Sequence, residues 1–272
     1  MAVILKASAI DYSYVPGQPV LRDVNLSVAA SSIVYVLGHN GCGKTTLLEI
    51  LSGVRAPLSG SVWLGDIDVH HLPARSRAQR IGLVPQIHMP VFAYTVRDIV
   101  MMGRTPHLHL FGMPGRADQD IVDQAIARVG LTALRNRAYT DLSGGERQLT
   151  LIARGLAQQT GVLLLDEPTA HLDPRNQQIV LETVTQLAGR DVTFVISSHN
   201  PNSALLYAHQ VVVMKAGRVI VSGSPAEVLT EETLSRSYDM PVEVIYNEQQ
   251  EARAVVPRRN GSGAEHKIAE PL

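Results

Sequence analysis

Residues 33–51 read IVYVLGHNGCGKTTLLEIL, and this stretch decides the fold of the chain. The apolar residues 33–37 favour a buried strand, and a helical pattern begins at Thr46. Between them, residues 38–45 have the G-x4-G-K-T spacing of a phosphate-binding loop, in which backbone N–H groups surround phosphate oxygens. We therefore expect a strand, a phosphate-binding loop and a helix whose positive end points at the bound anion.

The residue types inside this loop fit a nucleoside triphosphate and its magnesium ion. Glycines at 38, 41 and 43 allow backbone conformations and close approaches that a Cβ would prevent. Lys44 is expected to reach the β- and γ-phosphates, and the hydroxyl of Thr45 is expected to ligate Mg²⁺. A plain glycine-rich turn before a helix is the alternative, which the strand and the helix on either side disfavour.

The composition is that of a globular protein without an overall charge bias. A chain of 272 residues buries on the order of 70–75% of its unfolded surface. Its 24 Lys and Arg residues nearly balance its 25 Asp and Glu residues, and the net charge is −1. This balance gives no general field that would attract nucleic acid or anionic lipid, so we expect no nucleic-acid partner.

Cysteine usage and hydropathy favour a cytosolic setting. The only cysteine is Cys42, inside the phosphate-binding loop, so no disulfide can form within the chain. Residues 1–14 lack the features of a signal peptide, and no apolar run approaches the ~18 residues that span a bilayer. If the protein serves a membrane process, we expect it to be a peripheral subunit.

Two adjacent acids follow a predicted buried strand. The apolar run 162–165 is typical of a strand buried on both faces, and it leads into Asp166 and Glu167. Ligands of α/β proteins bind at the carboxyl edge of the sheet. There, one acid can hold Mg²⁺ through water and the next can polarise an attacking water, although the pair taken alone also fits a solvated strand end.

Two more predicted strands lead to polar residues at the same edge. The apolar run 192–196 leads to His199, whose neutral imidazole can hydrogen-bond a γ-phosphate. The run 81–85 leads to Gln86. Taken alone, the histidine also fits a packing or surface position, and the glutamine fits an ordinary loop.

A serine and two glycines open a predicted helix after Leu142. Ser143 stands at the N-cap position, and Gly144 and Gly145 follow it. Glycine costs about 0.5–1 kcal/mol relative to alanine inside a helix. Its use here makes sense if the start of the helix presents bare N–H groups to an anion.

An aromatic residue and a group of histidines allow further interpretations. Tyr14 is a candidate for stacking on an adenine ring, and packing on a sheet face fits it equally well. His88, His107 and His109 stand near a loop, but no Cys or carboxylate lies beside them at ligand spacing, so we expect no metal site there.

Outside these segments, apolar periodicity predicts strands and helices along most of the chain. Residues 3–36 are expected to form antiparallel strands at 3–10, 24–28 and 33–36. Beyond residue 247 the chain is polar, and we expect a mobile tail. The other expected elements are helices over 45–52, 95–139 and from Pro174, strands over 61–64, 81–85, 162–165 and 192–196, a hairpin over 211–221, and one or two short helices over 225–238.

Taken in order, these segments resemble the motifs of ATP-binding cassette (ABC) proteins, over about residues 3–240. The resemblance implies an α/β P-loop NTPase cassette with a RecA-like core, an N-terminal antiparallel β subdomain and a helical subdomain at about 95–158. The cassette would occupy residues 1–240, with a C-terminal extension and polar tail at 241–272. The segments that carry the resemblance are GHNGCGKT at 38–45, Gln86, LSGGE at 142–146, VLLLDEP at 162–168, HLD at 171–173 and His199.

The resemblance also implies roles for individual residues. Glu167 matches the catalytic base, His199 the switch histidine and Gln86 the sensor of the γ-phosphate. The implied metal-binding residues are Thr45, Gln86 and Asp166. The implied ATP-binding residues are Tyr14, Gly38, Asn40, Gly41, Cys42, Gly43, Lys44, Thr45, Thr46, Ser143, Gly144, Gly145 and Asp173.

The resemblance further implies that the chain acts with a second copy of itself. Ser143, Gly144 and Gly145 match the family's signature motif, which covers ATP bound to the other cassette. The expected assembly is a head-to-tail dimer with two composite sites, in which hydrolysis depends on closure. One departure from the family pattern is Ala170, where many members carry serine. It puts one hydrogen bond across the dimer in doubt.

The segment VRDIVMMGRTPHL at 96–108 is similar to ATPase subunits of importers for iron chelates, haem, cobalamin and, in some members, molybdate. It implies a membrane permease dimer that docks at 87–101, an extracytoplasmic substrate-binding protein reached indirectly, and a peripheral position on the cytoplasmic face of the inner membrane. The sequence does not specify the substrate.

Three other classes are weighed against an importer ATPase. Chromosome and repair ATPases insert a long coiled coil before the LSGGE segment, whereas 97 residues separate Thr45 from Leu142 here (142 − 45 = 97). Exporters with fused membrane helices need a spanning segment. A soluble cassette for translation or cluster assembly stays open as the alternative.

Overall fold

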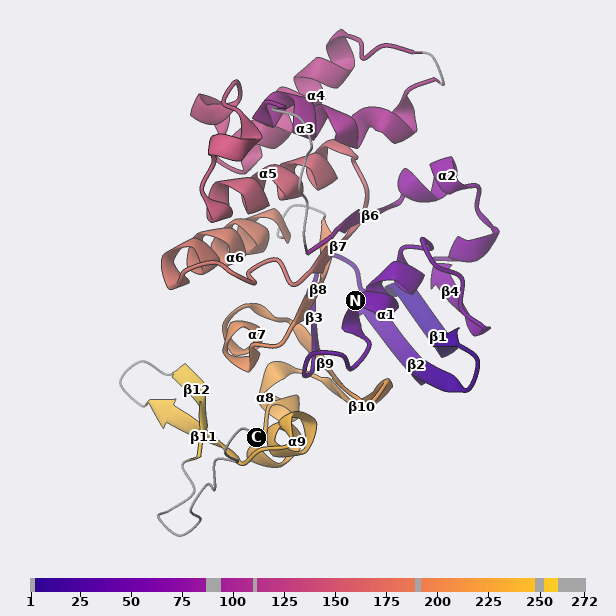
Figure 1. Ribbon diagram of the computed structural model, residues 1–272, viewed down its shortest axis with the longest axis vertical. Coiled ribbons are helices and arrows are strands. Elements are labelled where there is room, and N and C mark those ends of the chain that lie inside the picture. Colours follow the sequence, from indigo (N-terminus) through magenta and orange to yellow (C-terminus); the bar gives the residue numbers. More distant parts are fainter. Residues whose placement is uncertain (1–2, 87–93, 110–111, 189–191, 248–251, 259–272) are drawn as a thin grey trace, which may run out of the picture.

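Strand β3 (Ile33–Leu37) runs through the middle of a mostly parallel sheet in the computed structural model (Figure 1). The structure describes residues 3–86, 94–109, 112–188, 192–247 and 252–258. Within them, the sheet has the order β10-β9-β3-β8-β7-β6, and only β10 is antiparallel to its neighbour. The other strands are β6 (Ile81–Val84), β7 (Val162–Asp166), β8 (Thr193–Ser198), β9 (Gln210–Lys215) and β10 (Arg218–Gly223).

The direction of β3 corrects one expectation. Residues 33–36 were expected to belong to the antiparallel N-terminal strands, but β3 pairs in parallel with β8 and β9. Every residue of β3, β7 and β8 is buried. A continuous apolar run is what a parallel strand needs when helices or another layer cover both of its faces.

The side chains of β3 alternate between two hydrophobic clusters. Ile33, Tyr35 and Leu37 belong to the cluster under helices α5 and α6, whereas Val34 and Val36 belong to the cluster under α1. Successive residues of a strand point to opposite faces, so this strand joins both halves of the core. The covering helices are α1 (Lys44–Leu51), α5 (Gly144–Ala157) and α6 (Pro174–Ala188).

A separate antiparallel sheet forms the N-terminal side of the molecule (Figure 1). Its order is β2-β1-β4-β5, and its apolar side chains share a cluster with α1. This confirms the antiparallel strands expected before residue 30. The strands are β1 (Val3–Val15), β2 (Gln18–Ala29), β4 (Ser59–Leu64) and β5 (Ile67–Asp68), and η1 (Val69–His71) and α2 (Ala74–Ala78) follow them.

A group of helices lies beyond the β6–β7 side of the central sheet, at the top of Figure 1. Arg104 fastens this group together, because its Nε lies 2.9 Å from Asp118 Oδ1 and its Nη1 donates to the carbonyl of Ala157 at 2.8 Å. The subdomain boundaries at about 95–158 stay a prediction. The elements are α3 (Val96–Met101), η2 (Met102–His107), α4 (Arg116–Arg128), η3 (Thr132–Leu134), η4 (Tyr139–Asp141) and most of α5.

The C-terminal part contains a strand that the sequence did not predict. Residues 252–257 form β12, which pairs antiparallel with β11 and buries Val255, so the expectation of a mobile tail is wrong there. The remainder of that expected tail, 248–251 and 259–272, lies outside the described residues. The elements here are α7 (Pro201–Tyr207), α8 (Pro225–Val228), α9 (Glu231–Tyr238), β11 (Val242–Asn247) and β12 (Ala252–Pro257).

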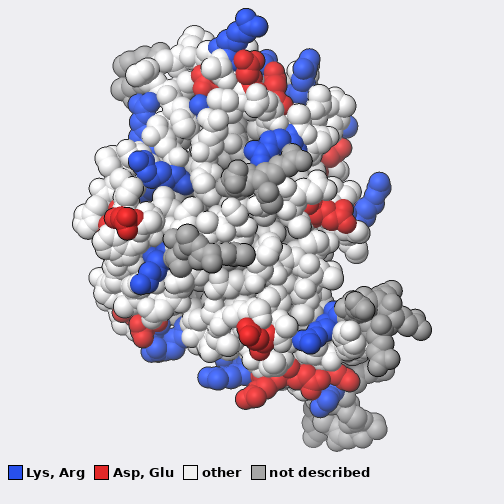
Figure 2. Space-filling model, turned by 180° about the vertical axis from the view of Figure 1, so that it is seen from behind, with Lys and Arg blue, Asp and Glu red and all other residues white. Residues whose placement is uncertain are grey.

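Basic and acidic side chains are interspersed on the face seen in Figure 2, in keeping with the nearly neutral sequence. Among the described residues, no helix has the length and apolar character to cross a bilayer. The same residues contain no group of three or more His, Cys, Asp or Glu side chains arranged to hold a metal ion. His88, one of the three histidines weighed above, lies outside the described residues.

Replacing Leu164 with alanine tests the two-sided burial of the central sheet. Leu164 in β7 is 0% exposed, so the Leu164→Ala variant should lose about 2–5 kcal/mol of unfolding free energy through lost burial and a residual cavity. Urea denaturation followed by circular dichroism measures the change. Leu58→Ala is the matched control, because Leu58 is 68% exposed and its loss should cost less than about 0.5 kcal/mol. Equal losses in both variants would contradict the assignment of β7 to the core.

Candidate functional site

Residues from distant parts of the sequence meet around a cavity of about 660 Å³ at the carboxyl edge of the central sheet. The phosphate-binding loop follows β3, Gln86 follows β6, Glu167 follows β7 and His199 follows β8. Parallel strands bring their carboxyl ends to one edge, which explains this gathering. The predicted site residues that line the cavity are Tyr14, Asn40, Gly41, Gly43, Lys44, Thr45, Thr46, Gln86, Glu167 and His199.

The phosphate-binding loop needs glycine at two positions for different reasons. Gly43 has φ +105°, a conformation that L side chains rarely adopt, and it is the N-cap of α1. Gly38 passes close to β9, where an added Cβ would lie 2.6 Å from the carbonyl oxygen of Met214. No side chain caps the start of α1 within the described structure, so the N–H groups of its first turn remain available to an anion.

Cys42 turns away from the cavity. Its side chain is 2% exposed and packs in the cluster under α1, and neither Cys42 nor Gly38 lines the cavity. Burial raises the pKa of the Cys42 thiol. These two residues can therefore contribute backbone groups to the loop, while the cysteine side chain contributes to the core.

The amine of Lys44 is held inside the loop. Its Nζ donates to the carbonyl oxygens of Gly38 at 2.8 Å and His39 at 3.2 Å, and it lies 3.2 Å from Glu167 Oε1. The Lys44 side chain is only 6% exposed. Burial of an ammonium requires such partners, since an unpaired buried charge is strongly unfavourable.

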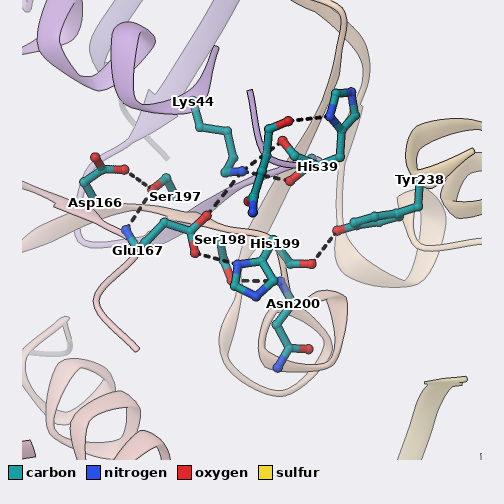
Figure 3. A network of polar contacts seen from close by, with 11 residues as sticks. His39, Lys44, Asp166, Glu167, Ser197, Ser198, His199, Asn200 and Tyr238 are labelled. Atoms are coloured by element: carbon teal, nitrogen blue, oxygen red, sulfur yellow. Dashed lines mark hydrogen bonds and ion pairs between the residues drawn. The ribbon is translucent and has the colours of Figure 1, made fainter. Parts of the chain in front are cut away.

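Glu167 lies between a lysine and a histidine (Figure 3). Its Oε1 faces Lys44, and its Oε2 lies 2.8 Å from Nδ1 of His199. With a carboxylate as partner, Nδ1 carries the proton and donates. The backbone of Glu167 has φ +47°, an uncommon conformation for a residue with a Cβ, and such positions concentrate at functional sites.

Ser197 organises both acids, and the sequence interpretation missed it. The hydroxyl of Ser197 donates to Asp166 Oδ1 at 2.5 Å and accepts from the backbone N–H of Glu167 at 2.9 Å (Figure 3). Asp166 and Ser197 are register partners in β7 and β8. Only the pairing of these strands identifies the serine, because nothing in the local sequence separates it from Ser198.

The residues expected near magnesium supply oxygen atoms, which Mg²⁺ prefers. Thr45 and Gln86 both line the cavity and are exposed. Asp166 is 5% exposed and lies behind Glu167, outside the cavity lining. The oxygen donors of Thr45, Gln86 and Asp166 therefore fit a magnesium ion.

Tyr14 stands at the rim of the cavity. Its hydroxyl lies 3.0 Å from Oγ1 of Thr46, and the guanidinium of Arg55 lies 4.7 Å from the centre of its ring. Arg55 is itself fixed by Glu49, at 2.7 Å, and by the hydroxyl of Tyr12. Tyr14 is 54% exposed, so an adenine ring can reach it, and stacking stays a prediction.

The serine and glycines at the start of α5 lie apart from the cavity. Ser143 is the N-cap, as expected, and its Oγ accepts from the N–H of Glu146 at 3.3 Å. Gly145 contacts the start of α6, where an added Cβ would lie 2.6 Å from Asn176 Oδ1, so a larger residue there would displace the Asn176 side chain. In this structure the cavity is not lined by Ser143, Gly144, Gly145 or Asp173, and Asp173 accepts hydrogen bonds from Asn176.

Comparisons with known proteins agree with this geometry. The family described as "ABC transporter" matches residues 21–170. The hemin import ATP-binding protein HmuV of Rhodococcus jostii is 40% identical, over 95% of this chain and 88% of that relative. The cobalamin import ATP-binding protein BtuD of Halobacterium salinarum is 43% identical, over 84% of this chain and 57% of that relative. Among solved structures, an inward-facing metal-chelate type ABC transporter has a TM-score of 0.84 and 33% identity, over 94% of this chain and 98% of that chain.

The reactivity of Cys42 tests the orientation of its side chain. The thiolate is the reactive form, and a raised pKa together with burial should slow its reaction with a disulfide reagent by more than about tenfold relative to the unfolded chain. The rate in the folded chain should rise with pH as the thiolate fraction grows. Because Cys42 is the only cysteine, absorbance after adding dithionitrobenzoate reports on it alone. Equal rates with and without guanidinium would mean that the thiol faces the cavity.

Proposed function

Because this chain belongs to the ABC transporter family, we propose that it is the ATP-hydrolysing subunit of a binding-protein-dependent importer. The observation that carries the proposal is the contact of one carboxylate, Glu167, with both Lys44 of the phosphate-binding loop and His199. The proposed cargo is a metal chelate of the iron-siderophore, haem, cobalamin or molybdate type. Relatives named as import proteins support this over a soluble cassette for translation or cluster assembly.

In the proposed site, ATP lies in the cavity with its phosphates on the glycine loop. The bare N–H groups at the start of α1 and the amine of Lys44 face the β- and γ-phosphates. The adenine ring would stack on Tyr14 at the rim of the cavity. Asn40 and Thr46 also line the cavity and would contact the nucleotide. Magnesium, when bound, would neutralise phosphate charge, and Thr45, Gln86 and Asp166 would hold it.

Glu167 is the proposed base for the attacking water. Binding of phosphate to Lys44 would replace the ion pair with Glu167 and free Oε1 to accept a hydrogen bond from water. His199 would keep its contact with Oε2 or turn to the γ-phosphate. Ser197 hydrogen-bonds both the Asp166 carboxylate and the backbone N–H of Glu167, which fixes the peptide between them. Asp166 would then support the metal while Glu167 acts as the base.

A second copy of the chain is proposed to complete each site. Ser143 and Gly144 are exposed at the start of α5 and lie outside the cavity of their own chain. An exposed helix start led by glycine suits a phosphate from another subunit. Asp173 caps α6 beside this surface and is proposed to lie at the same dimer interface.

The proposed membrane partner is a permease dimer, which would place the subunit peripherally on the cytoplasmic face of the inner membrane. A substrate-binding protein would act on the other side, through the permease. The proposed docking segment is 87–101, of which 87–93 lie outside the described residues. Near its described part, a hollow of about 460 Å³ is lined by residues of α2 and η2, including Arg75 and Pro106. A coupling helix of a permease would fit such a hollow.

Uptake by living cells tests the importer assignment. A strain without this gene should lose uptake of one radiolabelled haem, cobalamin, ferric siderophore or molybdate substrate. The wild-type gene should restore uptake, and a gene carrying Glu167→Gln should not. Restoration by the Glu167→Gln gene, or unchanged uptake of all four substrates after deletion, would overturn the assignment.

Glu167→Gln tests the role of the base directly. The amide keeps the shape of the side chain but cannot accept the proton from water, so ATP turnover should fall by about 10²–10⁴-fold. ATP binding should persist, and ATP with Mg²⁺ should convert the variant from monomer to dimer, as measured by light scattering after gel filtration.

The matched control is Glu182→Gln on the exposed face of α6, which should retain normal turnover. Normal hydrolysis by the Glu167→Gln variant would remove Glu167 from the role of base. A variant that stays monomeric with ATP would count against the composite site.

A further inference from the structure

The backbone of His199 is held by a residue from the C-terminal part of the chain. Tyr238, the last residue of α9, donates its hydroxyl to the backbone carbonyl oxygen of His199 at 2.9 Å (Figure 3). This is a contact across 39 residues of sequence, between the end of α9 and the segment that follows β8. It fixes the peptide from which the imidazole projects toward Glu167.

The end of α9 is itself anchored to the central sheet. Nζ of Lys215 donates to the carbonyl of Arg236 at 2.6 Å and pairs with Asp239 Oδ1 at 2.5 Å. Ser237, which is fully buried, donates to the carbonyl of Met214 at 3.4 Å. Met214 and Lys215 end β9, the strand beside β3. Tyr238 therefore projects from a part of the molecule that is fixed relative to the phosphate-binding loop.

The C-terminal part also contacts the chain just after His199, at the start of α7. Helix α7 begins two residues after His199, and the amide of Asn202 in its first turn pairs with β12. The N–H of Val255 donates to Asn202 Oδ1 at 2.7 Å, and Asn202 Nδ2 donates to the carbonyl of Val255 at 3.1 Å. The position of His199 is thus supported from both sides by residues of the C-terminal part, Tyr238 on one side and Val255 on the other.

The surroundings of Tyr238 keep its hydroxyl protonated. Burial raises the pKa of the Tyr238 phenol, and the nearby Cys42 and Glu167 raise it further. The raised pKa keeps the phenol in its protonated form, in which the hydroxyl can donate to the His199 carbonyl.

We propose that Tyr238 is a positioning residue for ATP hydrolysis, which acts through the backbone of His199 to set the imidazole against Glu167 and the γ-phosphate. The inference rests on the proposed ATPase mechanism and adds a residue to it. Small displacements of a group that contacts reacting atoms reduce the rate far more than the affinity for the ground state. The expected signature is a loss in kcat with little change in KM.

The Tyr238→Phe variant removes the hydroxyl and keeps the ring. The kcat for MgATP should fall by about three- to tenfold, the range expected for one hydrogen bond, whereas KM should stay within about twofold. The melting temperature should lie no more than about 2–4 °C below that of the matched control Tyr246→Phe, because one hydrogen bond is lost. The ring of Tyr246 is 55% exposed on β11, and the kcat of this control should equal that of the wild type. An unchanged kcat in Tyr238→Phe would overturn the proposal.

A double-mutant cycle tests whether the tyrosine acts through the histidine. In a His199→Ala background, adding Tyr238→Phe should lower kcat no further, because the imidazole to be positioned is absent. An equal fall in both backgrounds would show that Tyr238 acts by another route and would overturn the proposal.

A second readout separates this proposal from the ATPase mechanism. The imidazole resonances of His199 can be assigned among the 10 histidines by their absence in the His199→Ala spectrum. In the nucleotide-free chain, Tyr238→Phe should shift these resonances and Tyr246→Phe should not. Absence of ATP hydrolysis in the wild type would overturn the proposed function. Absence of the shift in Tyr238→Phe would overturn the positioning of His199 by Tyr238, whether or not the wild type hydrolyses ATP.

Discussion

The ion pair between Lys44 and Glu167 is the contact on which the site depends. A lysine that is 6% exposed must have its charge matched, and in this structure the matching group is the carboxylate of Glu167, directly after β7. In the proposed cycle, the same carboxylate is the base. In that proposal, binding of the triphosphate to Lys44 and release of Glu167 from its ion pair are one exchange of partners on a single amine.

The central sheet makes this exchange possible because it fixes the partners independently of each other. Lys44 begins α1 after the loop that follows β3, Glu167 directly follows β7 and His199 directly follows β8. Strands β3 and β7 both pair with β8, so their carboxyl ends keep a constant spacing. The alternating burial of β3 ties this edge to both hydrophobic clusters, and the groups at the edge are held by the whole core.

Much of this arrangement was predictable from the sequence, and the limits have physical causes. The phosphate-binding loop, the acids after β7 and the N-cap at Ser143 depend on local patterns, so the sequence predicted them. The direction of β3 depends on its neighbours, and a short apolar run does not reveal them. Ser197 and Tyr238 act through contacts that exist only after β8 and α9 are placed, so no spacing rule identifies them. Strand β12 is short and stands between polar stretches of sequence, which made it resemble part of a tail.

The pair of hydrogen bonds between Asn202 and β12 affects where the chain can be shortened for expression. Expression designs often trim polar ends to aid crystallisation, and the sequence invites a cut near residue 247. Such a cut would remove β12 and with it both hydrogen bonds between Val255 and Asn202 of α7. The residues that follow β8, including His199, would then be held less firmly. A shortened version could bind nucleotide normally and yet turn over slowly, and a slow turnover measured on it would be an artefact of its design.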